Sequence, residues 1–154
     1  MRPTGKVVLD DVDKRIIEQL QQDGRRPYTQ IAPAVGLSEA AVRQRVQRLI
    51  DSGVMQIVGV TDPKMIGFGR QAMIGLTVEG DTRKVADAVA AFEEVVYVVL
   101  TAGSLDVLVE VVVEDDEHLL DLLNNKIRAI DGVRDTETFL YLRIHKETYA
   151  WGAP

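Results

Sequence analysis

The tripeptide Gly36-Leu37-Ser38 places the strongest restriction on how this 154-residue chain can fold. Glycine commonly ends a helix and serine commonly begins one, so the tripeptide predicts a tight turn between two helices. The apolar spacing predicts one helix over 28–35 and another from Ser38 to about Gly53. A further helix is predicted over 10–22, with an aspartate at its start. Three helices with this turn make a helix-turn-helix.

Proline 33 lies inside the second of these predicted helices. A proline in a helix removes one backbone donor and crowds the preceding turn. We therefore expect the helix over 28–35 to be distorted or to begin late.

The third predicted helix has two different sides. At 100° per residue, Val42, Val46 and Leu49 share one side and are expected to pack on the first two helices. The opposite side displays Ala40, Gln44 and Gln47, flanked by Arg43 and Arg48. Glutamine can pair with adenine edges, and arginine with guanine or phosphate, so this side favours DNA binding over a solvated helix without a partner.

The predicted DNA-binding residues extend over the first three turns of that helix. They are Ser38, Glu39, Ala40, Arg43, Gln44, Arg45, Gln47 and Arg48. Arg45 lies beside the apolar side, so we expect it to contact phosphate or to brace the domain. The base-reading residues are expected to be Arg43, Gln44 and Gln47.

The charge of the chain is unevenly distributed. The net charge is −6, but residues 1–60 carry nine Lys and Arg against seven Asp and Glu, a net of +2. Residues 61–154 carry nine against seventeen, a net of −8. This asymmetry indicates that the first part of the chain meets a polyanion and the second does not.

The second part of the chain alternates between strand and helix patterns. A short strand over 55–60 leads into a hinge, and strands are predicted over 72–78, 95–100, 107–113 and 136–144, with helices over 82–92 and 116–130. The order βαββαβ is that of a ferredoxin-like sandwich, so the fold class is α+β. The predicted domains are a helix-turn-helix over 1–54, a hinge over 55–70 and a ferredoxin-like domain over 71–154.

The segment 107–113, with the sequence VLVEVVV, is largely apolar on both alternating faces. Two helices can cover only one face of a four-stranded sheet, and an exposed apolar face favours aggregation. The sequence therefore predicts that the second face packs against the same face of another copy, giving an obligate homodimer.

The residues around the turn resemble the Lrp/AsnC family of transcriptional regulators, also called feast/famine regulators. The resemblance rests on Leu37-Ser38, Val42, Arg45-Val46, Arg48-Leu49 and Gly53-Val54, and it continues through TDPK at 61–64 and MIG at 65–67. It covers roughly residues 8–147. It implies sequence-specific binding to double-stranded DNA, a hinge strand that pairs with its mate in a second subunit, and dimers that assemble further, for example into an octamer.

The segment 101–106 is the predicted small-molecule site. Gly103 allows a sharp turn and leaves its N–H open to a ligand carboxylate, and Asp106 can accept a ligand ammonium group. An amino acid carries both groups. On the residues alone, a simple hairpin capped by Asp106 is the alternative.

The family resemblance supports the ligand interpretation, because Gly103 and Asp106 match the family's Thr-Gly-x-x-Asp motif. Ala102 stands where the motif has threonine. The predicted effector residues are Ala102, Gly103, Ser104, Asp106 and Thr138, the last from a final-strand TET motif. The resemblance places the amino-acid effector between dimers.

Several classes of function are disfavoured by the composition. The chain has no cysteine, so thiolate chemistry and disulfides are excluded. We found no catalytic or metal-ligand motif and no apolar run long enough to span a bilayer. We therefore expect a cytoplasmic, nucleoid-associated protein that is not an enzyme and has no cofactor, metal or membrane partner. Two alternatives stay open: an effector-independent architectural DNA-binding protein, and a metabolite-binding ferredoxin-like protein without a DNA function.

Overall fold

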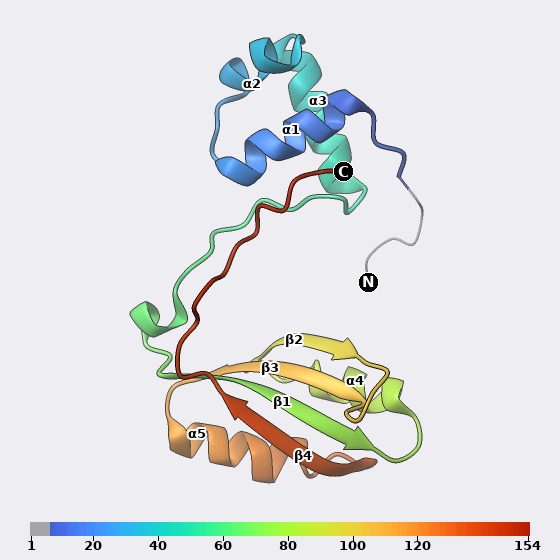
Figure 1. Cartoon of the computed structure of the whole chain (residues 1–154), viewed down its shortest axis with the longest axis vertical. Coiled ribbons are helices and arrows are strands. Elements are labelled where there is room, and N and C mark those ends of the chain that lie inside the picture. The colour runs from blue at the N-terminus through green and yellow to red at the C-terminus, as the bar shows by residue number, and fades with distance from the viewer. Residues whose placement is uncertain (1–6) are drawn as a thin grey trace. The chain divides into compact units, whose positions relative to one another are not determined.

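The computed structural model describes residues 7–154, which form two compact units (Figure 1). The first unit contains the described residues up to Val60 together with Lys146–Pro154, and the second contains Thr61–His145. Of the predicted hinge, residues 55–60 lie in the first unit. The C-terminal segment joins the first unit, and residues 61–70 join the second.

Three helices build the first unit, as predicted: α1 (Asp11–Gln22), α2 (Tyr28–Val35) and α3 (Glu39–Asp51). The carboxylate of Asp10 caps α1 by accepting the Asp13 N–H at 2.7 Å, and the Ser38 hydroxyl caps α3 by accepting the Ala41 N–H at 3.2 Å. Gly36 ends α2 at φ 73°, a left-handed conformation that favours glycine. The core of this unit contains Ile16, Ile17, Leu20, Ile31, Ala32, Val35, Val42, Val46 and Leu49.

The helix α2 begins at Tyr28 and continues through Pro33, so the expected late start was wrong. A proline at this position deprives the Thr29 carbonyl of its usual donor four residues later. Both Pro33 and Thr29 are exposed, so the unpaired carbonyl belongs to the solvent side of the helix and water can satisfy it.

The strand predicted over 55–60 is absent from the described chain. A strand needs a neighbour that supplies a ladder of hydrogen bonds, and within one chain this segment has none. The next regular element is the 3₁₀ helix η1 (Pro63–Ile66), which begins after the Asp62 side chain accepts the Lys64 N–H at 2.9 Å.

The C-terminal segment returns to the first unit through one side chain of α1. The Gln21 amide donates to the Gly152 carbonyl at 3.3 Å and accepts the Gly152 N–H at 3.0 Å. Ala153 packs against the helical core. These contacts explain why the segment groups with the helices.

The second unit has the predicted βαββαβ order. Its elements are β1 (Arg70–Val78), α4 (Thr82–Val89), β2 (Val95–Leu100), β3 (Val107–Val113), α5 (Asp116–Asp121) with its π-helical continuation η2 (Leu122–Ile127), and β4 (Val133–Leu140). The strands pair antiparallel in the order β2-β3-β1-β4. The last strand ends at Leu140 and not at Ile144, because β1 begins at Arg70 and its pairing with β4 starts at Ala72.

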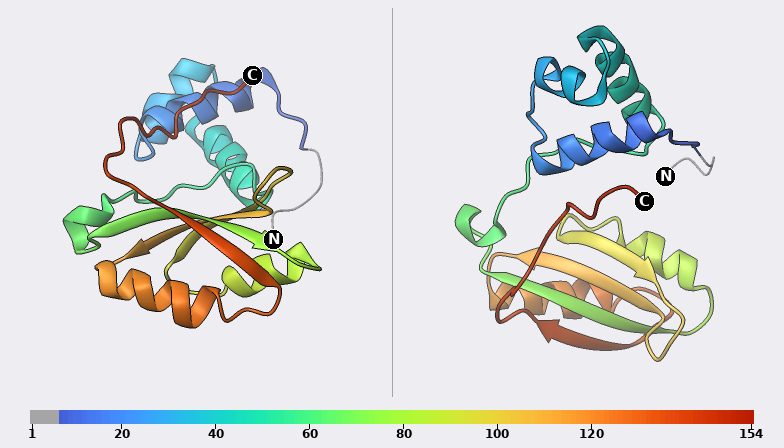
Figure 2. Two further views of the ribbon diagram at one scale, coloured as in Figure 1. Left: turned by 60° about the horizontal axis from the view of Figure 1, so that its bottom comes forward. Right: turned by 45° about the horizontal axis from the view of Figure 1, so that its top comes forward.

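The helices α4 and α5 lie on one face of this sheet (Figures 1 and 2). Val107, Val109, Val111 and Val113 of β3 point to that face and are completely buried. On the opposite face a row crosses all four strands through the paired residues Phe139, Met73, Glu110 and Tyr97. Tyr97 is 53% exposed and Phe139 45%, so α4 and α5 leave this face open.

No helix within residues 7–154 combines the length and the apolar character that crossing a membrane requires.

Glu94, directly before β2, contacts two basic side chains, one on α5 and one on η2. Its Oε1 contacts the Lys126 ammonium and lies 3.1 Å from Nε2 of His118. Burial raises the pKa of Glu94, but the hydrogen bonds from Lys126, from backbone and from His118 outweigh it and lower the pKa from 4.5 to about 2. The ionised carboxylate is therefore stabilised by folding.

Replacing this carboxylate should give a pH-dependent loss of stability. Because the folded pKa is depressed, the stabilisation is present above pH 4.5 and is lost as the pH falls towards 2. We expect Glu94→Gln to lower the free energy of unfolding by up to about 3 kcal/mol at pH 7 and by progressively less below pH 4.5. Urea unfolding across this pH range, with the exposed neighbour Glu93→Gln as control, measures the difference. A pH-independent loss would contradict the ionic origin.

Candidate DNA-binding face and effector loop

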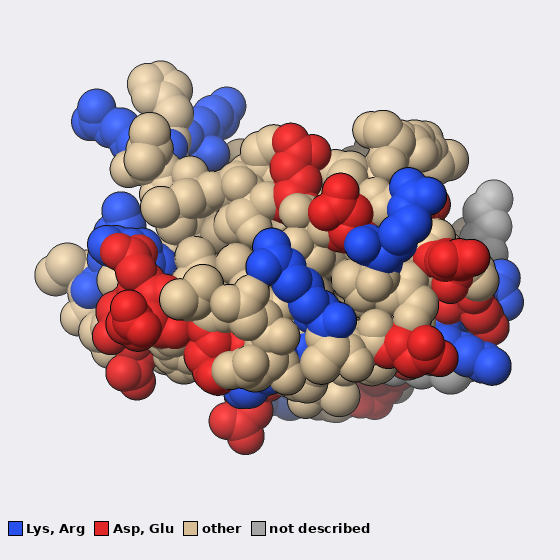
Figure 3. Space-filling model, turned by 90° about the horizontal axis from the view of Figure 1, so that it is seen from below, with Lys and Arg blue, Asp and Glu red and all other residues tan. Residues whose placement is uncertain are grey.

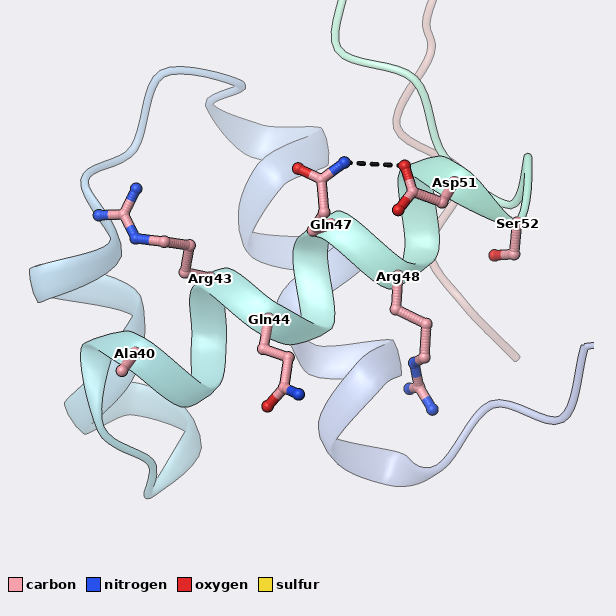
Figure 4. Close-up of a pocket in the computed structure, with 7 residues that line it drawn as sticks. All are labelled: Ala40, Arg43, Gln44, Gln47, Arg48, Asp51 and Ser52. Atoms are coloured by element: carbon pink, nitrogen blue, oxygen red, sulfur yellow. Dashed lines mark hydrogen bonds between the residues drawn. The ribbon is translucent and has the colours of Figure 1, made fainter.

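The outer side of α3 presents a shallow hollow whose lining residues are polar except for one alanine. Its lining comprises Ala40, Arg43, Gln44, Gln47, Arg48, Asp51 and Ser52 (Figure 4). Of the eight residues predicted to bind DNA, seven are exposed and Arg45 is half-buried. The apolar residues Val42, Val46 and Leu49 are buried on the other side, as the helical spacing predicted.

The exposed side chains of α3 differ in how firmly they are held. Arg43 donates to Glu39 at 2.9 Å and lies over the Tyr28 ring, 5.2 Å from its centroid. Gln47 donates to Asp51 at 2.8 Å. Gln44 makes no hydrogen bond to the described part of the chain, so both its donor and its acceptor are available to a base edge.

Arg45 and Arg48 are held by carboxylates from the start of α1. Arg45 donates to Asp10 and to Asp13, at 2.7 Å each, and Arg48 donates to Asp13 at 2.5 Å. The Asp13 N–H and then Arg45 lower the pKa of Asp10, while Asp10 and then Asp13 raise the pKa of Arg45. Of the two expectations for Arg45, the structure shows the bracing one.

The sequence argument did not predict the role of Asp13, because it assigned the aspartates at the start of the first helix to capping and to the helix dipole. The Asp13 side chain is only 1% exposed. The available signal was spacing, because Asp13 stands three and four residues before Ile16 and Ile17 and therefore shares their buried side.

The face of the molecule drawn in Figure 3 mixes acidic and basic side chains without a continuous basic surface. Arg43 and Arg48, whose side chains are 65% and 52% exposed, are the cations that α3 offers to a polyanion.

The loop 101–106 is anchored by Asp106. The Oδ2 atom of Asp106 accepts the Val78 N–H at 2.8 Å. The backbone N–H of Asp106 donates to the Leu76 carbonyl at 2.8 Å. The Thr101 N–H donates to the Asp106 carbonyl at 3.0 Å and closes the loop. One carboxylate oxygen thus holds the loop against the end of β1, and the other has no hydrogen bond within the described chain.

Gly103 is not required by the backbone of this loop. Its φ lies outside the left-handed range, and a Cβ placed on it would meet open space. The argument that glycine is needed there for a sharp turn was therefore wrong. The exposure of Ala102, Gly103 and Ser104 leaves their backbone groups approachable, and a role in ligand binding stays a prediction.

The structure brings together four of the five predicted effector residues. Ala102, Gly103, Ser104 and Asp106 share one loop, whereas Thr138 pairs with Ile74 on the other side of the sheet centre. On β1, the pairing partner of Thr138 (Ile74) therefore lies four residues before Val78, whose N–H bonds Asp106. Leu105 was not predicted to matter, but it packs on Gly75, where a Cβ would come within 2.4 Å of Leu105 Cδ1.

The described residues contain no cluster of three or more His, Asp or Glu side chains arranged to hold a metal ion.

Comparisons with known proteins agree with this architecture. The AsnC-type helix-turn-helix domain matches residues 9–50, and the Lrp/AsnC ligand binding domain matches residues 71–151. The HTH-type transcriptional regulator FL11 of Pyrococcus furiosus is 36% identical over 143 residues, which cover 92% of this chain and 94% of that protein.

Two solved structures have the same fold. The leucine response regulatory protein LrpA of Mycobacterium tuberculosis is 30% identical with a TM-score of 0.82, covering 90% of this chain and 96% of that one. The regulator NMB0573 of Neisseria meningitidis, solved as a complex with L-Met, is 24% identical with a TM-score of 0.82, covering 93% and 96%.

The fold and the two matched domains define a helix-turn-helix transcriptional regulator. The chain belongs to the Lrp/AsnC family.

Proposed function

We propose that this protein binds double-stranded DNA as a homodimer, with α3 of each subunit in the major groove, and that an amino acid bound at the loop 101–106 modulates the binding. The observation that carries the proposal is the outer side of α3. Gln44 is exposed and unbonded within the described chain, between Arg43 and the tethered Arg48. Such a face supports base reading together with phosphate contact.

A dimer is supported by the open face of the sheet. The row Phe139, Met73, Glu110 and Tyr97 is largely apolar and is left open by α4 and α5. A two-fold dimer through this face presents two copies of α3, and each would read one half-site about one DNA turn, roughly 34 Å, or a multiple of it from the other. Further assembly of dimers, for example into an octamer, belongs to the same proposal.

An amino acid is the proposed effector because the loop 101–106 offers complementary groups. The exposed backbone around Gly103 can bind a carboxylate, and the free oxygen of Asp106 can accept an ammonium group. The matched region is a ligand binding domain, and the Neisseria protein of this fold was solved with L-Met. By linkage, an effector that favours one assembly state changes the spacing of the DNA-reading helices.

The two alternatives make different predictions. An architectural protein binds DNA with strong salt dependence and little sequence preference, and no amino acid changes it. A metabolite-binding protein without a DNA function binds no duplex. The unbonded Gln44 favours a regulator that reads sequence, which acts on chromosomal DNA at the nucleoid in the cytoplasm.

Replacing Gln44 should reduce sequence preference. A duplex selected by the wild-type protein from a random-sequence pool is compared with a scrambled duplex of equal composition, at fixed salt, by fluorescence anisotropy. We expect Gln44→Ala to weaken binding to the selected duplex by about 5- to 150-fold, because one base contact is lost, and to leave the scrambled duplex unaffected. The exposed Lys84→Ala on α4 is the control. An equal loss on both duplexes would contradict base reading by Gln44.

A charge on the open face of the sheet should separate the subunits. We expect Tyr97→Asp to shift the protein from dimer or larger species to monomer in sedimentation velocity at micromolar concentration, because the buried carboxylate would have no partner. Leu120→Asp is the matched control, because Leu120 is 51% exposed on α5 and away from that face. A monomeric wild-type protein, or an equal response of both variants, excludes this interface.

A side chain at position 103 should block the effector without disturbing the loop. A Cβ there meets open space, so Gly103→Val should keep the thermal stability of the wild type. We expect calorimetry with the twenty amino acids to give a ligand for the wild type and at least about tenfold weaker binding for the variant, because the approach to the backbone is filled. Glu93→Ala is the control, because Glu93 is exposed and lies just before the start of β2, whereas the loop follows the other end of that strand. Unchanged binding by Gly103→Val places the ligand elsewhere.

A further inference from the structure

Asp13 is the buried charged residue of the described chain, and it serves the DNA-binding helix. Its Oδ1 accepts from Arg45 at 2.7 Å and its Oδ2 from Arg48 at 2.5 Å. The Oδ2 atom also accepts the Asp10 N–H at 3.2 Å. Both carboxylate oxygens are therefore occupied, as a buried ion requires.

The two arginines differ in where their side chains end. The Arg45 side chain is 29% exposed and is shared between Asp10 and Asp13. The Arg48 side chain is 52% exposed, pairs with Asp13, and lines the hollow on α3 (Figure 4). One carboxylate thus holds Arg45 inward and fixes Arg48 at the edge of the DNA-binding face.

We infer that Asp13 is a positioning residue for DNA recognition, which fixes Arg48 in one direction and withholds Arg45 from phosphates. A free arginine can pair with any phosphate, and such contacts supply sequence-independent affinity. An arginine tethered by a buried carboxylate has lost that freedom before DNA arrives. Asp13 therefore lowers non-specific binding and favours the sequence at which Arg48 is correctly placed. This inference rests on the proposed DNA-binding function.

A simple brace between α1 and α3 predicts something different. If Asp13 only stabilises the first unit, its loss lowers the melting temperature and leaves the character of DNA binding unchanged. The salt dependence of binding separates the two roles, because its slope counts the phosphates that basic groups neutralise.

The test compares Asp13→Asn with Asp10→Asn, both in the full-length protein. The two variants change the net charge equally, and asparagine still caps α1 at position 10. Asp13→Asn releases Arg48, whereas after Asp10→Asn both arginines keep Asp13. Dissociation constants are measured for the selected and the scrambled duplex between 50 and 300 mM KCl, below the melting temperature of every variant.

We expect Asp13→Asn to steepen the slope of log K against log salt on the scrambled duplex by about one unit and to tighten that binding about three- to tenfold at low salt. Its preference for the selected duplex should fall by a similar factor. For Asp10→Asn, the changes in salt slope, in scrambled-duplex affinity and in preference should each be less than half as large. Equal slopes and preferences for the two variants would overturn the inference, whatever their melting temperatures.

A second variant keeps the test decisive if Asp13→Asn does not fold. Arg48→Gln removes the positioned arginine but leaves Asp13 paired with Arg45. We expect this variant to lose at least about tenfold on the selected duplex and clearly less on the scrambled one. An equal loss on both, or none, would overturn the inference. A wild-type protein that shows no preference at all would instead contradict the proposed function itself.

Discussion

The four-stranded sheet has two largely apolar faces, and the helices α4 and α5 cover only one of them. On β3, alternate valines are fully buried beneath α4 and α5, while Leu108, Glu110 and Val112 point to the other face. Burying apolar surface is favourable by about 25 cal/mol per Å², so packing a second copy against the uncovered face would stabilise the protein. Glu110 is not an obstacle to this, because its carboxylate already accepts from Gln71 at 2.8 Å. The proposed dimer thus rests on the same strand pattern that builds the fold.

The first unit contains α3, a helix with three arginines, in a chain whose net charge is negative. Carboxylates of α1 pair with Arg45 and Arg48, and Glu39 pairs with Arg43, so each arginine of α3 has a nearby acid. Pairing makes the face less attractive to any polyanion in general and leaves recognition to groups in defined positions. Under the proposed function, this pairing would let an acidic protein discriminate between DNA sequences without binding all DNA tightly.

The effector loop combines an anchor and an open group in one residue. One carboxylate oxygen of Asp106 accepts the Val78 N–H at the end of β1, and the other has no hydrogen bond within the described chain. A ligand that engages the free oxygen would therefore act on a group already fixed to the sheet. Leu105, packed against Gly75, ties the same loop to the centre of β1. A small molecule bound at this proposed site would therefore contact a loop that is joined to the sheet of the proposed dimer interface.

The sequence by itself determined the two folds, because helical spacing, the Gly36 turn and alternating strands are local signals that tertiary contacts reinforce. It also determined which side of α3 is buried. Only the tertiary structure decided the role of Asp13. Its buried carboxylate accepts hydrogen bonds from two arginines 32 and 35 residues away, and this pairing depends on how α1 crosses α3. The same holds for the segment 55–60, whose strand pattern lacks a partner in one chain, and for Gly103, whose backbone proved to be ordinary. Spacing along a chain specifies which face a residue shares, but not which distant group will meet it there.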